Sequence, residues 1–127
     1  DKTMFFNISI KIAIVVNIIA IISHVAVCFT DTTSNRSGQF REITRQCRWI
    51  GLLYFIFAWF MGDGSLVSSG RTTYEQVAFW MLVASIGWLI VFAVTLLSKF
   101  CGKEDVLGSK ALMMGVVYFL LAYLLHW

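Results

Sequence analysis

The chain has 127 residues, of which 59% are hydrophobic and 13% are charged, and its formal net charge is +3. Soluble domains are usually about 25% charged, and a chain this short cannot bury so much apolar surface in a core of its own. The composition therefore excludes an ordinary soluble domain, and so weak a positive charge gives no reason to expect nucleic acid as a partner.

The first hydrophobic segment, residues 4–30, predicts a membrane-spanning helix, because it is too long for the apolar region of a signal peptide. On a helical wheel, one arc of about 140° holds its polar residues: Asn7, Lys11, Asn17, His24 and Cys28. A polar face in a membrane should turn toward other helices or water. Two interpretations stay open: the amides join helices together, or the stripe lines a path for a solute or ion.

The second predicted span covers residues 44–64. Its uninterrupted apolar run, residues 49–61, spans only about 20 Å as a helix, against about 30 Å for the hydrocarbon core. We expect the flanking arginine side chains to snorkel, so that the span starts near Thr44. Asp63 is then expected at or just inside the opposite membrane face.

The third predicted span, residues 76–99, contains no charge and no proline between Gln76 and Lys99. Its uncharged part covers about 33 Å as a helix, which is enough to cross a bilayer. Trp88 falls in the middle, so its indole N–H needs a partner. Small residues that permit close helix contact occur here and in the neighbouring spans: Ala84, Ser85, Gly87, Gly51 and Gly115. The fourth predicted span is residues 106–127.

The distribution of basic residues predicts the orientation. They concentrate in the first and third loops and at the adjoining helix ends: Arg36, Arg41, Arg45, Arg48, Lys99, Lys103 and Lys110. Short loops rich in lysine and arginine stay in the cytoplasm. We therefore expect both termini and the second loop on the other side of a plasma membrane or bacterial inner membrane. Arg41, Arg45, Arg48, Lys99 and Lys103 are the candidate cytoplasmic contacts.

The opposite, outer side holds a second candidate group, a charged cluster: Lys11, Asp63, Arg71, Glu75 and His126. A lysine within a membrane is costly, so a carboxylate partner is expected, and Asp63 shares the predicted depth of Lys11. Alternatively, Lys11 snorkels outward and Asp63 is an ordinary interface residue. Together with the stripe on the first span, the candidate polar or ion path comprises Asn7, Lys11, Asn17, His24 and Asp63.

The sequence contains no motif that indicates an enzyme. It has no glycine-rich phosphate loop, no His-Glu-x-x-His pair and no nucleophile elbow. A metal site built from His24, Cys28, Cys47 and Cys101 is disfavoured, since no Cys-x-x-Cys pair is present and separate helices would have to bring the ligands together. We expect neither a metal nor another cofactor.

These patterns predict an all-α, four-helix transmembrane bundle that forms one integral membrane domain over residues 1–127. The loops are too short to hold a soluble domain, so the surfaces left for a partner are mainly helix faces. We expect a homo-oligomer or a larger membrane-protein partner, and a role as a subunit, an immunity-type inhibitor or a sensor. The comparison with immunity proteins is one of size and topology only. The alternative is an oligomeric channel or transporter whose path the polar stripe lines.

Overall fold

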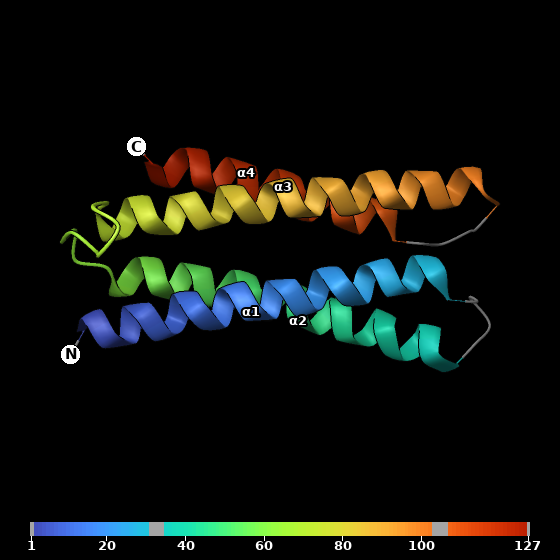
Figure 1. The fold of residues 1–127 in the computed structure, drawn as a ribbon, viewed down its shortest axis with the longest axis horizontal. Coiled ribbons are helices and arrows are strands. Elements are labelled where there is room, and N and C mark those ends of the chain that lie inside the picture. The colour runs from blue at the N-terminus through green and yellow to red at the C-terminus, as the bar shows by residue number, and fades with distance from the viewer. Residues whose placement is uncertain (1, 31–34, 103–106, 127) are drawn as a thin grey trace.

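In the computed structural model, the part of the chain that the structure describes, residues 2–30, 35–102 and 107–126, folds into four helices that run antiparallel in sequence order (Figure 1). They are α1 (Lys2–Phe29), α2 (Asn35–Met61), α3 (Thr73–Phe100) and α4 (Gly108–His126). Both termini and the connection between α2 and α3 lie at one end of the bundle (Figure 1). The predicted all-α fold is confirmed.

Three helices of the described chain are long and apolar enough to cross a membrane. Their candidate spans are Met4–Phe29, Thr73–Phe100 and Gly108–Leu125. The helix α2 is not among them, because its first half carries Arg36, Arg41, Glu42, Arg45 and Arg48. The polar half is nevertheless helical from Asn35 onward, well before residue 44. Its exposed residues stabilise it through bonds one turn apart, such as that from Gln46 Nε2 to Glu42 Oε1 at 2.9 Å.

The bundle consists of two helical hairpins. The helix α1 packs chiefly along α2, and α3 packs chiefly along α4, while α1 and α3 join the hairpins. Buried positions on α1 alternate in steps of four and three, the spacing of a left-handed coiled coil: Phe6, Ile10, Ala13, Asn17, Ala20, His24 and Val27. The same spacing continues on the facing side of α2 at Thr44, Arg48, Gly51, Phe55 and Ala58.

Polar side chains hold the helices together at three levels. Thr44 of α2 donates from Oγ1 to the Ala20 carbonyl of α1 at 3.0 Å. Ser85 of α3 donates from Oγ to the Gly115 carbonyl of α4 at 2.8 Å. Trp88 of α3 donates from Nε1 to Asn17 Oδ1 of α1 at 3.2 Å, which confirms that its indole N–H has a partner inside the bundle. Such bonds are expected where water is scarce.

The second helix ends earlier than the predicted limit at residue 64. The Gly62 N–H closes the last turn on the Ala58 carbonyl at 3.0 Å, and Gly64 has a φ of 82°, which glycine adopts without steric cost. Asp63 Oδ1 then accepts from the Ser65 N–H at 3.0 Å, an Asx turn. Asp63 is therefore an exposed loop residue rather than the end of a helix.

Candidate functional site

The centre of the bundle is a buried contact around Asn17. This side chain is 4% exposed and donates from Nδ2 to the Ala13 carbonyl at 2.9 Å while accepting from Trp88. Trp88 is fully buried, and its ring meets the His24 ring edge-on at a centroid distance of 5.8 Å. These contacts connect α1 with α3 and use both functional groups of the Asn17 amide. Asn17 therefore joins helices, as the first interpretation of the stripe expects.

Gly51 of α2 leaves the space that the Asn17 side chain occupies. A Cβ atom built at Gly51 would lie 2.5 Å from Asn17 Nδ2, so α2 can approach α1 here only because residue 51 has no side chain. One turn further along α2, the Phe55 ring meets the ring of Tyr118 from α4 edge-on, with centroids 5.7 Å apart. The four helices thus converge on one buried layer.

Only some of the other residues of the predicted stripe and path share this environment. His24 and Cys28 are buried with Asn17, whereas Asn7 and Lys11 are exposed on the N-terminal half of α1. Asp63 lies in the loop after α2. The stripe therefore divides into an exposed part near the N-terminus and a buried part further along α1. Three of the pockets in the described chain are lined by other residues.

The basic residues at the other end also divide by exposure. Arg45 and Lys99 are exposed, Arg41 is half-buried, and Lys103 lies outside the described residues. Arg45 forms an ion pair with Glu42. The Arg45 guanidinium that hydrogen-bonds Glu42, helped by Gln46, lowers the pKa of that carboxyl. Arg48 differs from the others, because it is only 3% exposed and faces the interior of the bundle.

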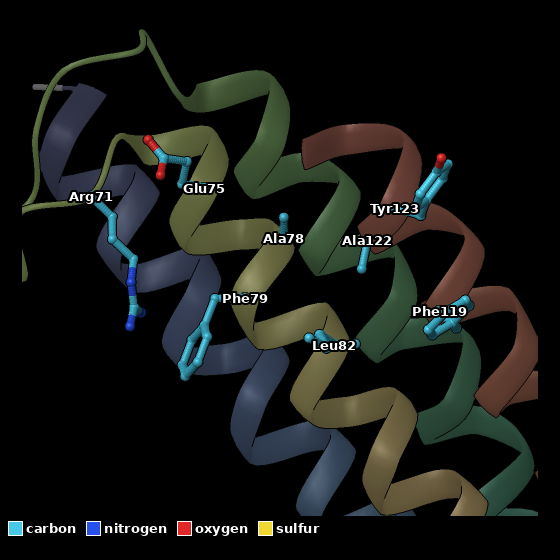
Figure 2. Close-up of a pocket in the computed structure, with 8 residues that line it drawn as sticks. All are labelled: Arg71, Glu75, Ala78, Phe79, Leu82, Phe119, Ala122 and Tyr123. Atoms are coloured by element: carbon cyan, nitrogen blue, oxygen red, sulfur yellow. The ribbon is translucent and has the colours of Figure 1, made fainter. Parts of the chain in front are cut away.

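A pocket of about 390 Å³ opens between α3 and α4 near the end of the bundle that holds the α2–α3 connection (Figure 2). This volume is at the small end of the range for ligand pockets, about 300–1,000 Å³. The lining is apolar apart from one cation, one carboxylate and one phenol: Arg71, Glu75, Ala78, Phe79, Leu82, Phe119, Ala122 and Tyr123. In Figure 2 the Arg71 side chain lies beside Phe79 on one side of the pocket, and Phe119 and Tyr123 lie on the other side, on α4.

The turn before α3 fixes the charged rim of this pocket. The Arg71 guanidinium carbon lies 4.0 Å from the centre of the Phe79 ring, a cation–π contact, and Nη1 donates to Gln76 at 3.4 Å. Glu75 belongs to a capping box with Thr72: its backbone N–H donates to Thr72 Oγ1 at 3.2 Å, and its carboxylate accepts from the Thr72 hydroxyl at 3.0 Å. Glu75 thus stabilises the first turn of α3 and also lines the pocket.

The structure brings together two members of the predicted outer cluster, Arg71 and Glu75, on this pocket. Lys11 and Asp63 are both exposed, Lys11 on α1 and Asp63 in the loop after α2. The side chain of His126 lies outside the described residues. The capping box has a sequence signal, Thr-x-x-Glu at residues 72–75, from which the start of α3 could have been predicted.

The predicted thiol and imidazole residues lie in three different environments: Cys28 is buried, Cys47 is partly buried and Cys101 is exposed. Within the residues that the structure describes, no three His, Cys, Asp or Glu side chains form a group that could hold a metal ion. Comparison with protein-family models, curated proteins and solved structures finds no significant match for this chain. A functional interpretation therefore depends on the geometry alone.

Proposed function

We propose that this chain is a four-span membrane protein that acts through helix contacts inside the membrane, as a subunit, immunity-type inhibitor or sensor of a larger membrane protein. In this proposal α2 crosses the membrane with its arginine-rich half at the cytoplasmic face, and both termini lie outside. The basic loops support this orientation. The burial of Arg48 supports a span that includes it, because an arginine inside protein does not meet lipid.

Thiol labelling in intact cells tests the path of α2. With the three native cysteines replaced by alanine, we expect Ser68→Cys, in the second loop, to react with a membrane-impermeant maleimide. Asn35→Cys, at the start of α2, should react only after permeabilisation. Both positions are exposed, so a difference reports sidedness rather than burial. Equal reaction of the two variants in intact cells would refute a membrane span formed by α2.

The observation that carries the functional proposal is the pocket between α3 and α4. Its rim includes the exposed side chains of Phe79, Leu82, Phe119 and Tyr123, which a soluble surface would not gather in one place. Arg71 is held at its outer edge by Phe79 and Gln76. A hollow with apolar walls and a charged rim suits a large side chain from a partner's transmembrane helix, with a polar group at the level of Arg71.

Site-specific photocrosslinking tests this surface. A photoreactive phenylalanine analogue in place of Leu82 points into the pocket, and the same analogue in place of Ile90 is a matched control on the same helix, exposed but outside the pocket. In the native membrane we expect a discrete protein adduct of one mass at position 82 and a much weaker one at 90. Adducts with lipid alone at both positions would contradict the proposal.

The channel alternative has less support. A path lined by the polar stripe needs Asn17 and His24 to face a passage, but Asn17 is engaged by Trp88 and closely approached by Gly51, and His24 is fully buried. Asn7 and Lys11 are the stripe residues left on the outer surface of α1. Between protomers of an oligomer they would form only the outer part of such a path.

A further inference from the structure

Arg48 is a buried cation, and two of its three side-chain nitrogens have no hydrogen-bond partner. The residue is 3% exposed, and neither Nε nor Nη1, both buried, has a hydrogen-bond partner. An arginine guanidinium keeps its charge in proteins, so this site cannot become neutral by losing a proton. Buried ions normally have a counter-ion and satisfied donors, because removing them from water is costly.

The position of Arg48 within the helix directs it toward α1. One turn before it, Thr44 hydrogen-bonds the Ala20 carbonyl of α1, and nearly one turn after it, Gly51 lies against Asn17 of α1. The three residues occupy successive positions of the same buried seam of α2. Arg48 thus lies near the level where the seam changes from polar residues to the apolar pair Phe55 and Ala58.

No carboxylate in the described interior balances this charge. The buried polar and charged residues of that part of the chain are serines, threonines, Asn17, His24 and Arg48 itself. The acidic residue nearest in sequence, Glu42, is exposed and accepts from Arg45 and Gln46. The neighbouring Arg45 adds a second positive charge rather than relieving the first.

We propose that Arg48 is the centre of an internal binding site for a small inorganic anion. The anion would accept the N–H groups of Arg48 that have no protein acceptor and would neutralise its charge. Exposed Arg36 and Arg45 on the same polar half of α2 favour the arrival of anions at this end of the bundle. This site is separate from the α3–α4 pocket, so it does not depend on the function proposed for that pocket.

Thermal denaturation of the purified full chain in an uncharged detergent tests the site, with chloride or phosphate replacing gluconate at constant ionic strength. We expect a saturable rise in melting temperature with at least one of the two anions. The rise should reach about 3–6 °C at a tenfold excess over the dissociation constant. Equilibrium dialysis with radioactive chloride or phosphate should give about one bound anion per chain.

Three variants make the result specific. Arg48→Met should abolish the anion-dependent rise in melting temperature. In gluconate this variant should melt above the wild type, because an uncharged side chain of similar volume replaces an unpaired buried charge. Arg48→Lys keeps the charge without the planar donors and should weaken anion binding at least tenfold. If Arg48→Met fails to fold, Arg48→Lys alone tests the site. Arg45→Met, an exposed control with the same charge change, should keep the response. A wild type without saturable stabilisation, or an equal response in the Arg48 variants, overturns the proposal.

Discussion

Replacement of Gly51 by alanine is expected to destabilise the bundle by about 1–3 kcal/mol, the usual cost of adding a methyl group to a filled core. The new Cβ would lie 2.5 Å from Asn17 Nδ2 and 3.1 Å from its Cγ. Asn17 cannot move aside cheaply, because its amide is bonded to the Ala13 carbonyl and to Trp88. The destabilisation should exceed the gain of up to about 1 kcal/mol that alanine brings to a helix interior.

Gly38→Ala is the matched control on the same helix. Nothing lies within 4 Å of a Cβ at residue 38, so this variant should be neutral or slightly more stable than the wild type. Unfolding in increasing SDS can be followed by the labelling of buried Cys28, after Cys47 and Cys101 are replaced by serine. If Gly51→Ala unfolds no earlier than Gly38→Ala, then α1 and α2 are not packed as closely as the contact at Asn17 requires.

The sequence predicts the helices better than their contacts. Long apolar segments separated by polar turns give α1, α3 and α4 directly. The wheel position of Asn17 left open whether its amide joins helices or lines a path, and in the structure the amide joins α1 to α3. The partner of Asn17 could not be predicted, since Trp88 is 71 residues away and their meeting depends on the register between the two hairpins. The small residues Gly51, Ser85 and Gly115 were predicted to permit close contact, and each does.

Two features of α2 differ from the expectation for different physical reasons. Its end is determined by Gly62 and the Asx turn at Asp63. The length of the apolar segment, from which the limit was predicted, contains no information about these local features. Arg48 was expected to extend toward the interface with Arg45, but it lies three residues before Gly51 and seven before Phe55, on their buried face. That spacing is visible in the sequence, whereas the lack of an internal acceptor is visible only in the structure.

Truncation of Trp88 to alanine is expected to have the largest effect of any single change considered, about 3–5 kcal/mol. The side chain is fully buried, contacts the His24 ring edge-on, and supplies the N–H that Asn17 Oδ1 accepts. Its removal leaves a cavity where α1 and α3 meet and an amide oxygen without its donor. Trp88→Phe should cost less, about 1–3 kcal/mol, because it keeps most of the ring volume and loses the hydrogen bond.

Trp49 provides the control, since it is the same residue type with 49% of its surface exposed. Trp49→Ala should change the free energy of unfolding by about 0.5 kcal/mol or less. Measured by the same Cys28 labelling in SDS, the order of stability should be wild type and Trp49→Ala, then Trp88→Phe, then Trp88→Ala. Because α1 and α3 provide the main contact between the hairpins, Trp88→Ala should also separate them first. Equal stability of the two alanine variants would mean that the hairpins are held together elsewhere than at Asn17 and Trp88.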